Sequence, residues 1–96
     1  MERPGADEAW WEVENVTTEH IVELNLIDSP VVNESWGPNQ IDQDVLPPTE
    51  DFRLREVPCP VVYDMRAVGE EGGAAMRYEV AFDCEQVVEW ELTELE

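Results

Sequence analysis

Basic side chains are what this chain has least of. Its 96 residues include five arginines and no lysine, against 24 acidic residues, which gives a formal net charge of −19. A field of that sign repels nucleic acid and anionic membranes and attracts positively charged partners. We therefore expect no direct binding of nucleic acid, which requires a basic patch, and no binding to a membrane.

Catalytic and metal-binding motifs are also missing. His20 is the single histidine, so a site built on two histidines is excluded, and we expect His20 to be a partly exposed residue at the start of a strand. The chain has no Gly-x-Ser-x-Gly, P-loop or Cys-x-x-Cys motif. The triplet Asp42-Gln43-Asp44 is faintly similar to a calcium loop but lacks the glycine and the terminal glutamate. We expect no enzymatic activity, no cofactor and no dedicated metal site.

Long apolar runs and cysteine are scarce. No run approaches the roughly 18 apolar residues of a membrane span, and the N-terminus lacks the basic and apolar regions of a signal peptide. This pattern predicts a protein of the cytoplasm of a bacterial or archaeal cell. Cys59 and Cys84 have no metal-site spacing. In that compartment two reduced thiols are expected rather than a disulfide.

Apolar residues are nevertheless plentiful enough to build a core. The hydrophobic fraction is 43%, and the chain holds four tryptophans. Disordered acidic chains are poor in aromatic and β-branched residues, so this one is predicted to fold. The length allows one domain. We expect a flexible tail over residues 1–8, followed by a single acidic domain over residues 9–96.

Alternation of apolar and polar residues predicts strands along most of that domain. In the segment 84–96, Val88, Trp90 and Leu92 alternate with glutamates as in a strand, whereas Val88, Leu92 and Leu95 also fit a helical stripe. We favour the strand. The fold is thus predicted to be mainly β, a small antiparallel sheet or sandwich of five to six strands, or α+β if a C-terminal helix forms. The other predicted strands cover residues 9–16, 22–26, 52–57, 61–68 and 75–82.

The last two of those strands should form a hairpin. They flank the segment Gly69-Glu70-Glu71-Gly72-Gly73-Ala74, and glycine supplies the positive φ that tight hairpin turns require. Strict alternation places Met76, Tyr78, Val80 and Phe82 in one apolar row. We expect Tyr63, Met65 and Ala67 to meet this row across the hairpin.

Residues 28–50 lack a regular pattern and are interrupted by four prolines and one glycine. Loops of this length are uncommon in small domains and are often functional. We therefore expect Trp36, Asp42 and Asp44 to contact a partner. The alternative is an ordinary connection in which Trp36 fills the core.

Carboxylates form rows on the predicted strands. Side chains two apart on a strand point the same way, about 6.5–7 Å apart. Glu12 and Glu14 form one outward row, and Glu89 and Glu91 form another. If the two strands are neighbours, the rows merge into an array with steps comparable to those between phosphates along a nucleic-acid strand. The acidic surface predicted to bind a partner comprises Glu12, Glu14, Glu23, Glu79, Asp83, Glu89 and Glu91.

In size, acidity, β-rich pattern and lack of a catalytic motif, the chain resembles the small acidic inhibitors of phages and mobile elements. These include anti-CRISPR proteins, anti-restriction proteins and inhibitors of uracil-DNA glycosylase. The resemblance covers size and composition, and it transfers no individual residue. It implies a protein that occupies the basic nucleic-acid-binding surface of a defence or repair complex and blocks DNA or RNA binding by charge mimicry.

The same composition is compatible with two further kinds of protein. One is a structural or assembly protein of a phage particle, or the immunity partner of a basic toxin. The other is a domain adapted to high salt, in which an acidic surface carries no information about partners.

Overall fold

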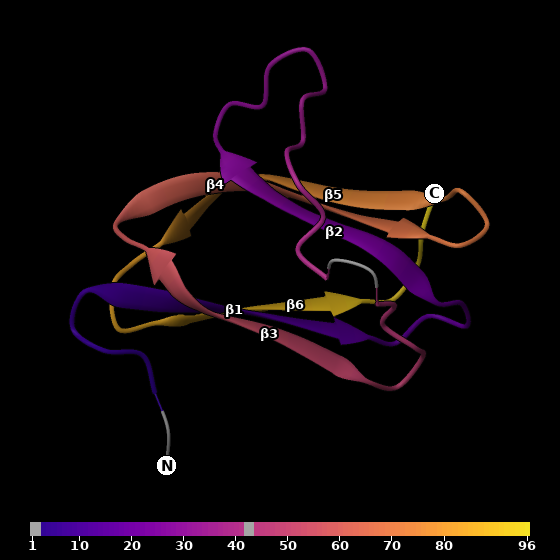
Figure 1. The fold of residues 1–96 in the computed structure, drawn as a ribbon, viewed down its shortest axis with the longest axis horizontal. Coiled ribbons are helices and arrows are strands. Elements are labelled where there is room, and N and C mark those ends of the chain that lie inside the picture. The colour runs from indigo at the N-terminus through magenta and orange to yellow at the C-terminus, as the bar shows by residue number, and fades with distance from the viewer. Residues whose placement is uncertain (1–2, 42–43) are drawn as a thin grey trace.

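The fold is a sandwich of two three-stranded β-sheets, as seen in a computed structural model that describes residues 3–41 and 44–96 (Figure 1). No helix occurs among those residues, so the segment after Cys84 forms a strand rather than a helix. The prediction of a mainly β sandwich is confirmed. The strands are β1 Glu8–Asn15, β2 Ile21–Asp28, β3 Asp51–Pro58, β4 Val61–Gly69, β5 Ala74–Phe82 and β6 Val87–Leu92.

The two sheets are assembled from strands that are not all consecutive. One has the order β3-β1-β6 and the other the order β2-β4-β5. Three of the pairings are antiparallel, as expected, but β1 and β6 pair in parallel. A parallel pair cannot be joined by a tight turn, and here residues 16–86 separate its two members. The first and last strands therefore lie side by side.

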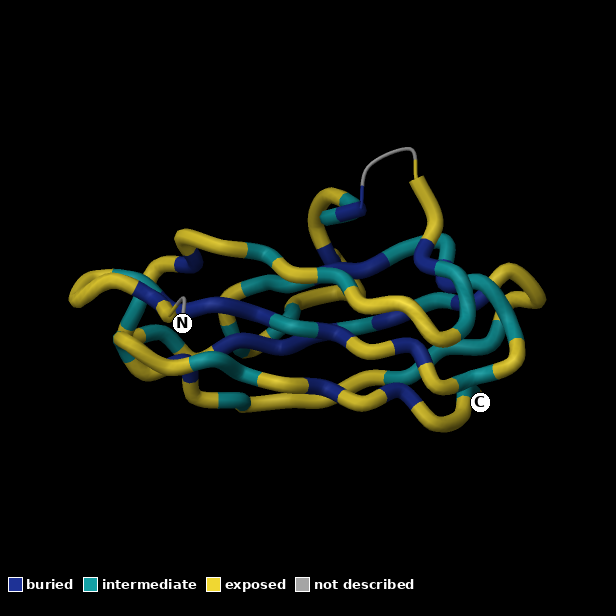
Figure 2. Tube along the Cα trace, turned by 90° about the horizontal axis from the view of Figure 1, so that it is seen from below, coloured by how far each residue is buried: buried dark blue, intermediate teal, exposed yellow. Residues whose placement is uncertain are grey.

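The core lies between the two sheets, where one face of each strand is buried. Trp11 and Val13 from β1 meet Leu24 from β2, Met65 from β4 and Phe82 from β5. All five are completely buried. In Figure 2 the buried stretches of the tube lie along the strands, and the turns are mostly exposed. This two-residue period fixes which side chains point outward.

The predicted β4–β5 hairpin is confirmed, but the predicted apolar row is wrong. Tyr63 pairs with Val80, whereas Met65 pairs with Arg77, so β5 contains one extra residue between these pairs. Such a bulge inverts the alternation that follows it. Consequently Val80 and Phe82 lie on the inner face of β5, while Met76 and Tyr78 lie on the outer face, 46% and 54% exposed.

A buried carboxylate holds this bulge in place. Asp64 accepts hydrogen bonds from the backbone N–H of Glu79 at 2.9 Å and of Val31 at 2.7 Å. Glu79 has the positive φ of 52° that the bulge requires. Burial by itself raises the pKa of Asp64, but these two bonds and one from the Ser29 side chain outweigh it and hold the pKa below its ordinary value. Asp64 thus ties β5 and the segment after β2 to β4.

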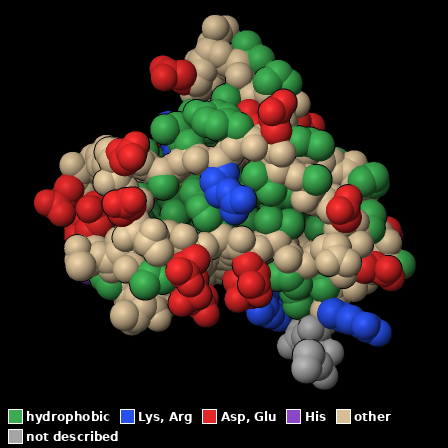
Figure 3. All heavy atoms as spheres, turned by 180° about the vertical axis from the view of Figure 1, so that it is seen from behind, with side chains coloured by type: hydrophobic (Ala, Val, Ile, Leu, Met, Phe, Trp, Pro, Cys, Tyr) green, Lys and Arg blue, Asp and Glu red, His purple; other side chains and the backbone are tan. Residues whose placement is uncertain are grey.

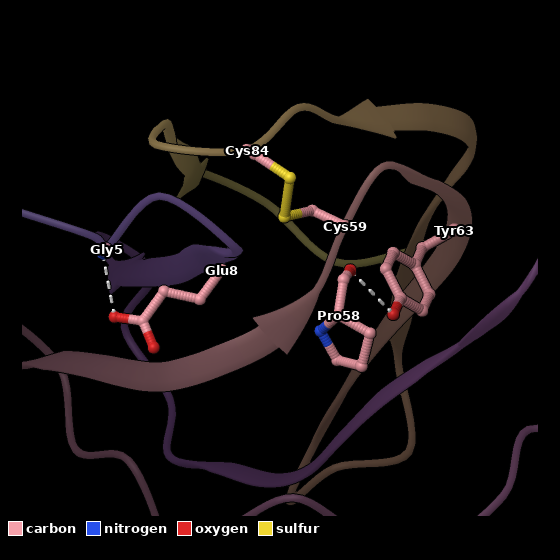
Figure 4. The surroundings of a disulfide bond; sticks show 6 residues. All are labelled: Gly5, Glu8, Pro58, Cys59, Tyr63 and Cys84. Atoms are coloured by element: carbon pink, nitrogen blue, oxygen red, sulfur yellow. Dashed lines mark hydrogen bonds between the residues drawn. A yellow bond between two sulfur atoms is a disulfide. The ribbon is translucent and has the colours of Figure 1, made fainter.

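The two cysteines form a disulfide, and the expectation of two reduced thiols is wrong. Cys59 lies in the β3–β4 connection and Cys84 in the β5–β6 connection, with their Cα atoms 5.2 Å apart (Figure 4). Both connections cross between the sheets, so the sandwich brings them together at one end. Nearby, the Tyr63 hydroxyl donates a hydrogen bond to the Pro58 carbonyl at 3.2 Å.

Side-chain amides fasten the long loop between β2 and β3. The completely buried Asn25 on β2 donates to the carbonyls of Gly37 and Pro38, both at 3.3 Å. Part of the loop therefore covers the outer face of β2. Val31 and Val32, in the same loop, do not form a strand. His20 is partly exposed and directly precedes β2, as predicted.

Candidate functional site: an acidic sheet face

Four glutamates form a two-by-two array on the outer face of the β3-β1-β6 sheet. In the parallel β1–β6 pair, Glu12 lies opposite Glu89 and Glu14 lies opposite Glu91. The array measures about 5 Å across the strands and about 7 Å along them, from the geometry of a sheet. A shallow depression of about 110 Å³ runs among the four side chains. The condition attached to the sequence prediction, that the two acidic strands be neighbours, is met.

Strand β3 places one carboxylate and one cation directly beside this array. Asp51 lies opposite Glu14, and Arg53 lies opposite Glu12. The Arg53 Nε donates to Glu12 Oε2 at 3.0 Å, so one of the negative charges is paired. We call the five carboxylates Glu12, Glu14, Asp51, Glu89 and Glu91 the acidic face.

A basic end adjoins the acidic face on the same sheet. Trp10 points outward from β1, yet it is only 4% exposed because two guanidinium groups cover its ring. The Cζ atoms of Arg53 and Arg55 lie 5.1 and 4.8 Å from the ring centroid, and the Trp10 indole N–H donates to Glu8 at 3.1 Å. On this face of the sheet the arginines therefore lie around Trp10 at one end, and most of the carboxylates lie towards the other end.

Other acidic residues predicted for the same surface lie elsewhere. Glu23 projects from β2 in the other sheet, where its carboxylate accepts a hydrogen bond from Arg66 at 2.9 Å. Glu79 is at the bulge of β5, and Asp83 follows β5 just before the disulfide. The structure thus brings together four of the seven predicted acidic residues.

The loop residues have separate roles. Trp36 is buried, but its partners are Tyr78, at 6.0 Å between ring centroids, and the Arg66 guanidinium, 5.2 Å from its ring. It covers the outer face of the β2-β4-β5 sheet instead of filling the central core. Asp44 is exposed near the start of β3. Asp42 lies outside the described residues.

Sequence reasoning missed Asp51, Arg53 and Arg55 as members of this site. Asp51 directly precedes the segment predicted as a strand, and Arg53 shares its side of that strand. The alternation therefore contained the signal for their orientation. What it did not contain was the pairing of β3 with β1, which places them beside the glutamates.

The chemistry available to the acidic face is the binding of cations. Carboxylates accept charge-assisted hydrogen bonds from guanidinium and ammonium groups, and a planar guanidinium can be bound by both oxygens at once.

Among the described residues, no helix is long and apolar enough to cross a membrane. Comparison of the chain with protein-family models, curated proteins and solved structures finds no match.

Proposed function

We propose that the acidic face binds the basic nucleic-acid-binding surface of another protein and blocks its access to DNA or RNA by charge mimicry. The observation that carries the proposal is the in-register pairing of Glu12 with Glu89 and of Glu14 with Glu91. A groove built for a polyanion binds it largely through release of counterions. A rigid carboxylate array can compete for such a groove without any base-like chemistry.

The energetics of the sheet support a binding role. Like charges directly opposite each other destabilise a strand pair, whereas an opposite-charge pair contributes up to about 1 kcal/mol. Two such unfavourable pairs occur side by side on β1 and β6. Departures of this kind from local optimality are typical of functional sites.

The uneven surface favours a specific partner over adaptation to salt. On the face shown in Figure 3, hydrophobic side chains surround a basic one, and the acidic side chains lie towards the periphery. A domain adapted to high salt loses structure at low salt, whereas the proposed inhibitor stays folded and binds most tightly there.

A cytoplasmic site of action remains part of the proposal, and it requires the acidic face to persist when the two thiols are reduced. The disulfide favours a second candidate, a particle component or a partner of a secreted toxin, since disulfides persist mainly outside reducing compartments. Binding measured with and without a reductant separates the two candidates.

The test compares three forms of the protein as immobilised bait in a bacterial lysate. The first is unchanged, and the second carries Gln at Glu12, Glu14, Glu89 and Glu91. The third is a control of the same net charge, with Gln at the exposed residues Glu34, Glu56, Glu85 and Glu94.

We expect the unchanged protein and the control to retain nucleic-acid-binding proteins that are released by salt and by added DNA. The variant of the acidic face should retain none of them. Equal retention by both substituted forms would show that total charge, rather than the array, determines binding.

A further inference from the structure

A groove of about 530 Å³ lies between the described loop residues 40–41 and 44–47 and the start of β3. Its walls include the apolar side chains of Ile41, Val45 and Phe52 and the carboxylates of Asp44, Glu50 and Asp51. Val45 is 46% exposed, which is high for an aliphatic side chain. None of the described residues that line the groove is basic.

One wall of the groove is fastened to β2 by the Asn39 side chain and by the backbone N–H of Gln40, which donates to the Leu24 carbonyl at 2.7 Å. The Asn39 Oδ1 accepts hydrogen bonds from the backbone N–H of Leu24 at 3.0 Å and of Ile41 at 3.1 Å. Its Nδ2 donates to the Val22 carbonyl at 3.1 Å. Residues 39–41 are thereby held against the edge of the sheet.

The segment from Leu46 to Thr49, which leads into β3, is fastened to the end of β1 and the start of β2. The buried Asn15 donates through Nδ2 to the Leu46 carbonyl at 2.9 Å, and its backbone carbonyl accepts from the Thr49 N–H at 2.7 Å. Leu46 and Ile21 exchange two backbone hydrogen bonds, at 2.8 and 2.9 Å. Hydrogen bonds thus hold residues 39–41, Leu46 and Thr49 to the body of the sandwich, and a preformed site costs less to occupy.

The groove is continuous with the acidic face. Asp51 lines the groove and lies opposite Glu14 on the neighbouring strand. An extended chain bound along the carboxylates can therefore reach the groove at Asp51, which belongs to both.

We propose that this groove receives an apolar side chain of a basic segment of the partner, whose flanking arginines or lysines lie on the acidic face. The inference rests on the proposed function and names the chemistry of the segment recognised. The apolar walls favour an aliphatic or aromatic side chain, which is removed from water on binding. The three carboxylates at the groove attract the cations on either side and repel acidic peptides and nucleic acid.

Two synthetic peptides test the proposal. Both are nine-residue chains of arginine and glycine with the same charge, and they differ only at the central position, which is glycine in one and leucine in the other. We expect the leucine peptide to bind about tenfold more tightly, as measured by calorimetry at low salt, because it buries one aliphatic side chain.

Matched substitutions locate the effect. Val45→Ser should make the affinities for the two peptides equal. Val62→Ser is the control, because Val62 is exposed to a similar degree, 44%, but belongs to β4 in the other sheet. Both positions are exposed, so near-ultraviolet circular dichroism should confirm that both variants fold.

The outcomes separate this inference from the proposed function. If both peptides bind equally well, the acidic face is supported and the groove is excluded as the site of an apolar anchor. A preference for leucine that survives Val45→Ser also overturns the groove. If neither peptide binds, the proposed function fails and the inference fails with it.

Discussion

The two outer faces of the sandwich use their charges in opposite ways. On the β2-β4-β5 sheet, Arg66 donates to Glu23 and to the buried Asn25, both at 2.9 Å, and its guanidinium stacks on Trp36. The loop after β2 covers part of that face. On the β3-β1-β6 sheet, four carboxylates stand in an open array.

This difference distinguishes charge that supports the fold from charge that is available to a partner. Within the described part of the chain, Glu12 is the member of the acidic face that has an ion-pair partner. On the opposite face the polar groups of Asn25 and Arg66 are satisfied internally, as buried polar groups must be. We therefore expect substitutions on the two faces to affect different properties.

We call the outer face of the β2-β4-β5 sheet, over which the loop lies, the covered face. The largest effect on stability should come from a substitution there. Trp36→Ala removes a buried ring that contacts Tyr78 and Arg66. We expect the free energy of unfolding, measured by urea denaturation, to fall by about 3–5 kcal/mol. Binding of a basic partner by the fraction that remains folded should not change. If Trp36→Ala abolished binding while neutralising the acidic face did little, an aromatic interface would replace the charge array as the binding site.

The disulfide should stabilise the whole fold, but the acidic face should not require it for binding. Replacing Cys59 and Cys84 together by serine opens a loop with a sequence separation of 25. We expect the free energy of unfolding to fall by about 3–4 kcal/mol, from the entropy of loop closure. Binding below the new melting temperature should persist. Loss of binding in a variant shown to be folded would contradict action in a reducing cytoplasm.

Asp64 should make the covered face sensitive to acid. Its pKa is lowered in the folded state, so its ionised form stabilises the fold above the unfolded-state value of about 3.9. That contribution is lost as the pH falls from about 4 through the lower folded-state value. Asp64→Asn should therefore be less stable at pH 7 and show a weaker loss of stability between pH 5 and pH 2. Parallel stability curves for the variant and the unchanged protein would contradict this role.

The smallest effects should come from single positions of the acidic face. Glu91→Gln removes one exposed carboxylate opposite Glu14. Exposed ion pairs contribute about 0.2–1 kcal/mol each, so we expect affinity for a basic partner to fall by at most about fivefold. Relief of repulsion should raise the free energy of unfolding by a few tenths of a kcal/mol. A single substitution that abolished binding would indicate a focused ionic contact instead of an array.

Local patterns predicted the strands well and their irregularities poorly. Alternation located β1 and both strands of the hairpin within one or two residues of their observed ends. It failed at Met76 and Tyr78, because one extra residue at the bulge reverses the side to which they point. The bulge depends on Asp64, whose hydrogen bonds reach Val31 and Glu79 from another strand. No local pattern in β5 contains that information.

Only part of the candidate site was predicted, because local patterns again did not contain the long-range pairing of strands. The outward direction of Glu12, Glu14, Glu89 and Glu91 follows from the alternation on their own strands. Glu23 obeys the same rule, yet it belongs to the other sheet. Alternation assigns a side chain to a face of its strand, but it does not assign the strand to a sheet.

The sequence by itself determined the negative charge, the positions of the strands and the side on which their carboxylates lie. These properties depend on composition and on neighbours two residues apart. Only the tertiary structure decided that β1 pairs with β6, which converts two separate rows into one array, and that Cys59 meets Cys84. Strand pairing and disulfide formation join residues distant in the chain, and their geometry is set by the packing of the whole core.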